Sequence, residues 1–129
     1  MILPGKNFGS KATPSEIAGS TLKVFNKVLP KELAGIAFLS GGQGDIEATE
    51  NLNAINQIDD LLWPLTFSYA RALQDAATKT WAGKQENLEV AQKVFTHRVK
   101  MNSLASQGKY SSDMEKGFAT SDGGQVTQD

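Results

Sequence analysis

The sequence predicts an α/β fold in which two short parallel strands are joined by one helix and flanked by others. The apolar runs at 35–39 and 65–67 are short and bounded by Gly, Pro or Ser, which is typical of strands buried in a parallel sheet. About 25 residues with a helical pattern separate them, as in a right-handed βαβ crossover. The remaining apolar positions recur with the 3.6-residue period of helices.

Size and composition exclude several classes of protein. The chain has 129 residues, of which 40% are hydrophobic and 21% charged, and this argues against a disordered polymer. Lys and Arg number 13 against 14 Asp and Glu, so we expect no general nucleic-acid binding. No apolar run approaches the roughly 18–20 residues that cross a bilayer, so no membrane segment is expected. The opening MILPGKNFGS resembles neither a signal peptide nor a transit peptide.

The first helix is predicted to follow a loop over residues 1–13. Thr13 can cap it, Pro14 suits its first position, and Glu16 completes a capping box. Pro30 ends it. Positions at helical spacing predict one buried stripe, made of Ile17, Thr21, Val24, Phe25 and Val28.

The two strands, at 35–39 and 65–67, are each expected to be buried on both faces. The helix between them is predicted from about 45 to 57. It should direct one set of side chains inward, namely Ile46, Thr49, Leu52 and Ile55.

Two more helices are predicted after the second strand. The first passes through Trp81 and stops at Gly83, and the second runs from about 86 to 107. The second should bury Leu88, Ala91, Val94, Phe95 and Val99. We expect residues 1–110 to form the folded part and 111–129, rich in Ser, Asp, Gly and Thr, to be a disordered tail.

Two parallel strands do not make a stable sheet by themselves, which raises a physical difficulty. Strands buried on both faces need neighbours, and this sequence contains none for them. The pattern therefore indicates the end of a larger α/β protein. A small α+β domain with two central strands is the alternative.

Small and polar residues follow each predicted strand. Ser40, Gly41 and Gly42 come after the first, and Ser68 and Arg71 after the second. Glycines let backbone N–H groups form an anion-binding nest, helix N-termini add positive potential, and an arginine can bind phosphate bidentately. The (β/α)₈ barrel places a phosphate site after its last two strands. A phosphate site is therefore predicted, against the plainer interpretation of an ordinary turn and a surface arginine.

Other catalytic chemistry has little support in the sequence. Ser40 lacks a G-x-S-x-G motif, and His97, which is expected to be solvated, lies in a helix among charged residues. With no cysteine and a single histidine, we expect no disulfide and no metal site. The lysines fall in loops or on solvated helix faces, where nothing lowers the pKa of an amine nucleophile. Three side chains are expected to decorate a helix surface, namely Asn51, Asn53 and Asn56.

Five ordered motifs carry a family resemblance: GIAFLSGGQ at 35–43, NLNAIN at 51–56, LTFSYARAL at 65–73, WAGKQEN at 81–87 and NSLASQGKY at 102–110. With the opening M-x-x-P-G, they resemble class I fructose-bisphosphate aldolase. The resemblance runs from Met1 to about Tyr110 and corresponds to roughly the last third of the family's chain. It implies the carboxyl-terminal fragment of a (β/α)₈ TIM barrel, with the two strands as the seventh and eighth.

The resemblance also implies an activity and a site. The family reversibly cleaves fructose 1,6-bisphosphate to dihydroxyacetone phosphate and glyceraldehyde 3-phosphate through a lysine Schiff base, without a metal or cofactor. Ser40, Gly41 and Gly42 match its phosphate-binding Ser-Gly-Gly, and Ser68 and Arg71 match the same region. The implied partners are a sugar-phosphate substrate and the amino-terminal barrel portion, in a parent enzyme that is a cytoplasmic homotetramer, with a plastid as the alternative location.

Three departures from the family pattern shape the hypothesis. The Schiff-base lysine belongs to a Lys-Pro-x segment that would directly precede Met1. Ala70, a candidate backbone contact, stands where the family usually has glycine, and Asp129 stands at the end of the chain where family tails often have tyrosine. The sequence therefore predicts a fragment that binds substrate phosphate and is inactive alone. The alternatives are a stand-alone sugar-phosphate-binding module and a fragment that complements an amino-terminal piece.

Overall fold

A computed structural model describes residues 1–118 of the chain. Its two strands, β1 (Ile36–Phe38) and β2 (Leu65–Phe67), pair in parallel, with Ala37 opposite Thr66. The α/β prediction is confirmed, and both strands lie within the predicted runs. The parallel register turns the carboxyl ends of both strands to the same edge of the sheet.

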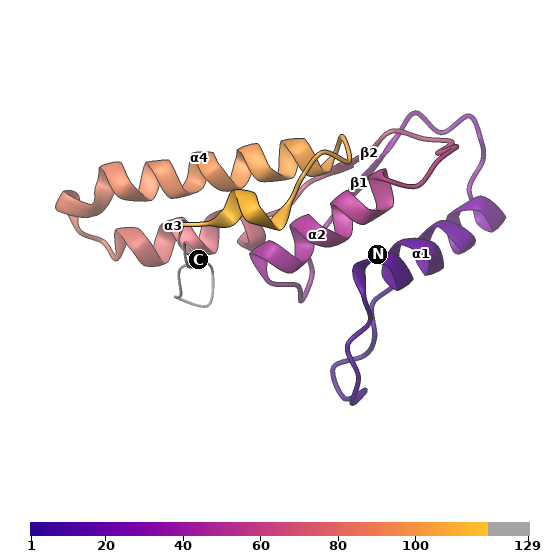
Figure 1. Cartoon of the computed structure of the whole chain (residues 1–129), viewed down its shortest axis with the longest axis horizontal. Coiled ribbons are helices and arrows are strands. Elements are labelled where there is room, and N and C mark those ends of the chain that lie inside the picture. Colours follow the sequence, from indigo (N-terminus) through magenta and orange to yellow (C-terminus); the bar gives the residue numbers. More distant parts are fainter. Residues whose placement is uncertain (119–129) are drawn as a thin grey trace.

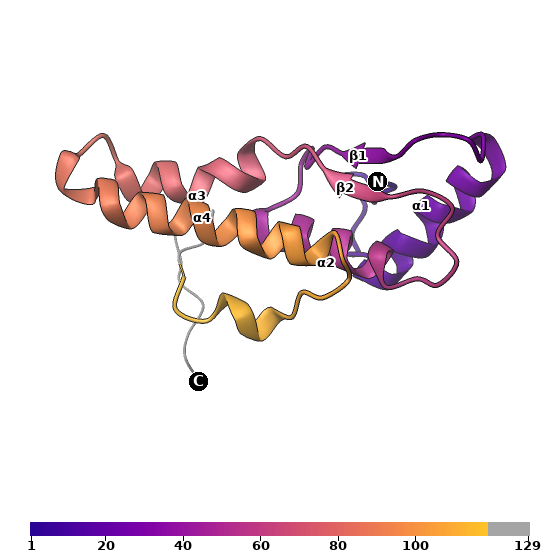
Figure 2. The same cartoon turned by 90° about the horizontal axis from the view of Figure 1, so that it is seen from above.

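The described chain also contains four helices: α1 (Pro14–Val28), α2 (Asp45–Asn56), α3 (Arg71–Trp81) and α4 (Leu88–Ala105). Two short 3₁₀ turns lie before and after α4, at η1 (Gln85–Asn87) and η2 (Ser112–Glu115). Helices α3 and α4 run side by side at one end of the molecule and α1 lies at the other, with α2 between them (Figure 1). Seen from above, α1 and α2 pack on one side of the two strands (Figure 2).

The first helix begins as its sequence predicts. The Glu16 carboxylate accepts a hydrogen bond from the Thr13 N–H at 2.8 Å, and the Thr13 hydroxyl accepts one from the Glu16 N–H at 3.3 Å. This capping box satisfies two backbone donors that the helix itself leaves unpaired. It fixes where the loop over residues 1–13 joins the helix.

The core lies between the sheet and the four helices. Leu52 and Ile55 of α2 are fully buried, and the Phe25 ring stacks on Phe38 with ring centroids 5.9 Å apart. Trp63 is buried against the edge of Phe25 and donates its indole N–H to the Pro30 carbonyl at 2.9 Å. One apolar cluster thus joins the sheet to α1, α2, α3 and α4.

The prediction that both strands are buried on two faces is wrong for the described residues. Phe38 and Leu65 are buried, whereas Ala37 and Thr66 are exposed and Leu39 is 72% exposed. Successive strand side chains point to opposite faces, and the described helices cover only one of them. The other face of the sheet is therefore open to solvent.

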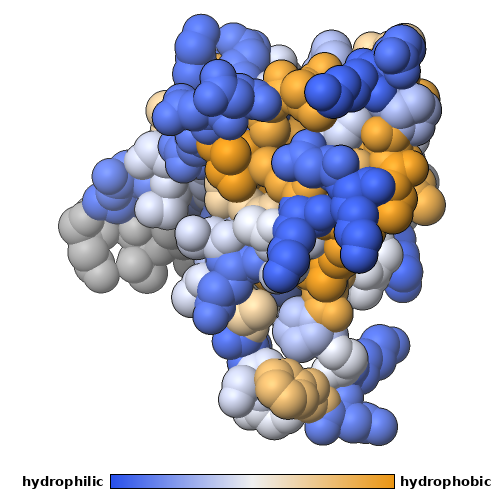
Figure 3. Space-filling model, turned by 90° about the vertical axis from the view of Figure 1, so that its right-hand side faces the viewer, coloured by the Kyte–Doolittle hydropathy of each residue, from blue (hydrophilic) through white to orange (hydrophobic). Residues whose placement is uncertain are grey.

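The predicted helical stripes are also only partly buried. Ile17 and Thr21 are buried in α1, but Val24 and Val28 are exposed. Three of the predicted buried positions of α4 are exposed as well, namely Leu88, Phe95 and Val99. These apolar positions lie beyond the reach of the neighbouring described elements. Figure 3 views the end of the molecule that carries α1, where hydrophobic patches lie between hydrophilic residues on the surface.

The segment after the last long helix differs from the expected disordered tail. Residues 111–118 are part of the described structure and include η2, in which Glu115 is 2% exposed. The physical reason is an ion pair between Glu115 and the buried Arg98, which sequence periodicity does not reveal. Residues 119–129, the rest of the predicted tail, lie outside the described residues.

The helices of residues 1–118 include none with the length and apolar character of a membrane span.

The turn after α4 requires glycine, and this gives a first prediction. Gly108 has φ +67°, and an added Cβ would lie 2.8 Å from the Asn56 carbonyl oxygen. We expect Gly108→Ala to lower the free energy of unfolding by about 1–3 kcal/mol, measured by urea unfolding followed by circular dichroism. The matched control is Gly19→Ala, inside α1 with no atom within 4 Å of the added Cβ, which should stabilise by about 0.5–1 kcal/mol. Equal urea midpoints for the two variants would contradict this account.

Candidate functional site

Residues from both strand ends meet at one edge of the sheet. The Ser68 N–H donates to the Phe38 carbonyl at 2.8 Å, which extends the pairing one residue beyond β2. The Gln43 N–H donates to the Ser40 carbonyl at 2.9 Å and closes a tight turn after β1. Gly42 in this turn has φ +79°, a conformation that side chains strongly disfavour. Glycine at position 42 is therefore favoured by the turn that leads into α2.

A cavity of about 340 Å³ opens at this edge, a size suited to a small molecule. It brings together three of the predicted site residues, Ser40, Gly42 and Arg71. The other predicted residues, Gly41 and Ser68, do not line it. Its complete lining is Lys6, Ser40, Gly42, Gln43, Gly44, Arg71 and Asp75.

Ser40 is the least exposed polar residue that lines this cavity. It is 9% exposed, and its hydroxyl is not one of the buried, unpaired side-chain atoms of residues 1–118. A hydroxyl can both donate and accept a hydrogen bond. The Ser40 hydroxyl can therefore bind a polar molecule in the cavity.

Positive potential reaches the cavity from two helices. Gly44 directly precedes α2, and Arg71 is the first residue of α3, so the N-termini of both helices open onto it. The Arg71 side chain is exposed and has no ion-pair partner in the described part of the chain. Backbone N–H groups, a hydroxyl and a guanidinium converge here, a combination that suits a phosphate group.

Ala70 occupies the N-cap position of α3 and is exposed. Its φ is −101°, so this position does not need the positive φ that would favour the glycine usual in the family. The alanine is accommodated here without left-handed backbone strain. A backbone contact between Ala70 and a phosphate stays a prediction.

Sequence reasoning missed two charged residues of the cavity. Asp75 lies one helical turn after Arg71 on α3, and the i, i+4 spacing could have revealed it. Lys6 lies in the loop before α1 and approaches the strand ends only through the tertiary fold. No local sequence signal marks it.

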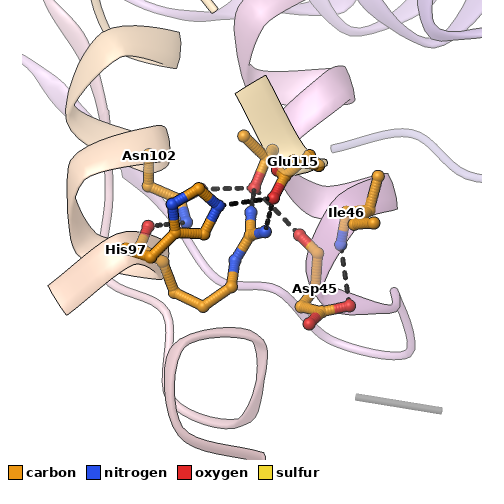
Figure 4. A network of polar contacts seen from close by, with 7 residues as sticks. Asp45, Ile46, His97, Asn102 and Glu115 are labelled. Carbon is orange, nitrogen blue, oxygen red and sulfur yellow. Dashed lines mark hydrogen bonds and ion pairs between the residues drawn. The ribbon is translucent and has the colours of Figure 1, made fainter. Parts of the chain in front are cut away.

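A second polar cluster is buried away from this cavity, between α4, α2 and η2 (Figure 4). The Arg98 side chain is fully buried and donates through Nη1 to Glu115 Oε2 at 2.6 Å. Its Nη2 donates to the Thr49 hydroxyl, also at 2.6 Å. Asn102 closes the cluster, because its amide donates to the Arg98 carbonyl and its Oδ1 accepts from Thr49. The cluster ties three elements together through one guanidinium.

The expectation that His97 is solvated is wrong. His97 is 7% exposed, its Nε2 lies 2.8 Å from Glu115 Oε2, and its ring stacks on Phe118 with centroids 3.6 Å apart. Glu115 and Phe118 thus cover His97 on α4, and no helical period in the sequence reveals these contacts.

Asn51 and Asn53 were likewise expected on the surface but are buried. Asn51 donates to Gln43, and Asn53 accepts from the backbone of Tyr110.

The buried cluster has perturbed electrostatics but no sign of a metal site. Burial alone would raise the pKa of Glu115, but the Arg98 guanidinium and the contact with His97 outweigh it and hold that pKa below its ordinary value. Burial raises the pKa of Tyr69 and of Tyr110. Among residues 1–118, no group of three or more His, Asp or Glu side chains is placed to hold a metal ion.

Comparisons with known proteins identify the family. The model of the family described as "Glycolytic: Fructose-bisphosphate aldolase class-I" matches residues 1–127. The chain belongs to the class I fructose-bisphosphate aldolases. This confirms the resemblance that the five sequence motifs carry.

Aldolases from plants and an amoeba are close relatives of the chain. It is 49% identical over 115 residues to fructose-bisphosphate aldolase 1, chloroplastic, of Arabidopsis thaliana, which covers 89% of the chain and 29% of that protein. It is 46% identical to the cytosolic aldolase 4 of the same plant, covering 95% of the chain and 31% of the relative. The aldolase of Dictyostelium discoideum is 45% identical over 93% of the chain and 34% of its own length. The chain thus spans about a third of the length of these relatives.

A solved aldolase structure shares the fold. It is the Plasmodium falciparum fructose-bisphosphate aldolase, determined in complex with TRAP and a small molecule inhibitor. The match has a TM-score of 0.79 at 43% identity and covers 83% of this chain and 31% of the other. The arrangement of four helices and two parallel strands therefore corresponds to part of an aldolase.

The Arg98–Glu115 pair gives a second prediction. Because the folded-state pKa of Glu115 lies below its ordinary value of 4.5, its stabilising effect is present above that pH and is lost as the pH falls through the lowered pKa. Glu115→Gln should lower the free energy of unfolding at pH 7 by about 3–5 kcal/mol, because it leaves the Arg98 charge buried and unpaired. It should also flatten the acid limb of the stability profile, measured by urea unfolding at several pH values.

The control for this prediction is Glu89→Gln, which removes an exposed ion pair with Lys93 on α4. Exposed pairs contribute little, so the urea midpoint of this variant should stay close to that of the parent. Similar midpoints for both variants at pH 7 would show that the buried pair is not a major source of stability.

Proposed function

We propose that this chain forms the phosphate-binding part of a class I aldolase, corresponding to the carboxyl-terminal third of the family's chain. The parent reaction would be the reversible cleavage of fructose 1,6-bisphosphate to dihydroxyacetone phosphate and glyceraldehyde 3-phosphate through a lysine Schiff base. The observation that supports this is the cavity shared by Ser40, Gly42 and Arg71 at the edge where both strands end.

Each group in the cavity has a defined role in this proposal. Arg71 binds phosphate oxygens through its planar fork of N–H donors, and the Ser40 hydroxyl donates to another oxygen. The backbone around Gly42 and the start of α2 direct N–H groups toward the same anion. Gly41, Ser68 and Ala70 are proposed to contribute at the rim. Holding the phosphate in this way would place the substrate carbonyl at a fixed distance from the strand ends.

The chain by itself is proposed to be inactive. All eleven lysines lie within residues 1–118, and every one is exposed. An amine that forms a Schiff base at neutral pH normally lies in a desolvated or cation-crowded site, whereas an exposed lysine is solvated. The nucleophile would therefore come from polypeptide outside this sequence.

The open face of the sheet favours a second role, complementation of a separate amino-terminal piece. Ala37, Leu39 and Thr66 are exposed, and each strand has one unpaired edge among the described residues. Strands contributed by the rest of a (β/α)₈ barrel would cover both features. The rival, a stand-alone sugar-phosphate-binding module, would have to leave the open face and the unpaired edges uncovered or pair them with another copy.

We also propose a homotetrameric parent in the cytoplasm, with the plastid as the alternative location. The location rests on the relatives' names, which include both cytosolic and chloroplastic enzymes.

The phosphate site is tested by calorimetry with dihydroxyacetone phosphate. We expect the 129-residue chain to bind it at millimolar concentration or below, and Arg71→Ala to weaken binding by about tenfold or more, since it removes a charge-assisted hydrogen bond. Lys84→Ala, which removes an exposed charge outside the cavity, is the control and should leave binding unchanged. Absence of heat from the parent, or equal binding by Arg71→Ala, would contradict the proposal.

The covalent chemistry is tested by trapping the Schiff base with borohydride. With fructose 1,6-bisphosphate, the chain alone should give no substrate-dependent adduct and no cleavage. Mixed with a separately produced amino-terminal aldolase fragment, it should restore cleavage, with the adduct on the other polypeptide. An adduct on this chain would refute its inactivity, and a folded but inactive mixture would count against complementation.

A further inference from the structure

We propose that Lys6, carried by the loop before α1, is a second phosphate-binding cation that closes over the anion held by Ser40 and Arg71. The inference rests on the proposed function and names a residue that the family resemblance does not assign. Lys6 lines the same cavity as those two residues. Three separate segments thus surround one anion, namely the loop before α1, the turn after β1 and the start of α3.

The charge balance of the cavity depends on Lys6. Its lining contains two cations, Lys6 and Arg71, and one anion, Asp75. Asp75 lies four residues after Arg71 on the same helix face, so a carboxylate that repels phosphate lies beside the guanidinium, although the two form no ion pair. Without Lys6 the side-chain charge of the cavity is formally zero, whereas a phosphate ester carries about −1.5 to −2 at pH 7. Lys6 gives the cavity the net positive charge that such a ligand requires.

Lys6 is placed to act in this way. Its side chain is exposed and has no ion-pair partner among residues 1–118, so no internal salt bridge has to break. Ser40 lines the same cavity, and its hydroxyl can donate to or accept from a polar ligand there. The ammonium group and the hydroxyl would then bind the same phosphate.

The loop that carries Lys6 is anchored at both ends but extends away from the helices between them (Figure 1). The Ile2 N–H donates to the Thr21 hydroxyl at 3.0 Å, and the capping box at Thr13 fixes the other end. Between these points, the turn in which the Phe8 N–H donates to the Gly5 carbonyl places Lys6 inside it. Binding of phosphate by Lys6 would therefore tie the middle of the loop to the strand ends.

The experiment is calorimetry of the full chain with dihydroxyacetone phosphate at low ionic strength. Lys6→Ala should weaken binding by about three- to tenfold and reduce its salt dependence. The matched control is Lys11→Ala, an exposed lysine of the same loop that does not line the cavity, for which we expect less than about a twofold change. Asp75→Asn should tighten binding by about threefold, because it removes the one carboxylate that repels the phosphate.

A second readout follows the loop itself. Trypsin cleavage after Lys11 should slow on addition of dihydroxyacetone phosphate in the parent, and this protection should be lost in Lys6→Ala. Equal affinity of Lys6→Ala and the parent, with Arg71→Ala still weakened, would overturn the role of Lys6 and leave the proposed function standing. Equal weakening by Lys11→Ala would also overturn it, because the effect would then be general loop charge. Absence of binding by the parent would overturn the proposed function and this inference together.

Discussion

The parallel pairing of β1 and β2 is the constraint on which the candidate site depends. Parallel strands end at the same edge, so the residues after Phe38 and after Phe67 are brought together although about 30 positions separate them in the sequence. The helices that follow both start at this edge, which aligns their positive ends on one cavity. An antiparallel pair would have placed these two segments at opposite ends of the sheet.

Arg98 and Arg71 have different roles, and the difference follows from how deeply each side chain is buried. Arg98 is fully buried and paired with Glu115, so its charge serves to hold α4, α2 and the 111–118 segment together. Arg71 is exposed at a cavity and has no ion-pair partner in the described residues, so its charge is available to a ligand. The same residue type thus stabilises the fold at one position and is suited to recognition at the other.

Local sequence signals predicted the positions of the helices and strands well, but they predicted poorly which side chains are buried. The capping box at Thr13 and the turn at Gly42 are encoded within a few residues, so the starts of α1 and α2 could be predicted. Burial of His97 depends on residues 112–118 folding back, and exposure of Val28 depends on how far its neighbours extend; neither leaves a periodic signal. The strand-end rule likewise predicted Ser40 and Arg71 from topology, whereas Lys6 arrives from a loop whose path is set by tertiary contacts.

The open face of the two-stranded sheet has a consequence for the lifetime of the chain in a cell. Chaperones and proteases recognise incompletely folded or assembled proteins by unpaired strand edges and exposed apolar side chains. The described residues show both features, the second at Leu39. We therefore expect the lifetime of this polypeptide to be set by how quickly its sheet is covered. Its steady-state abundance would then follow that of whichever polypeptide covers the sheet.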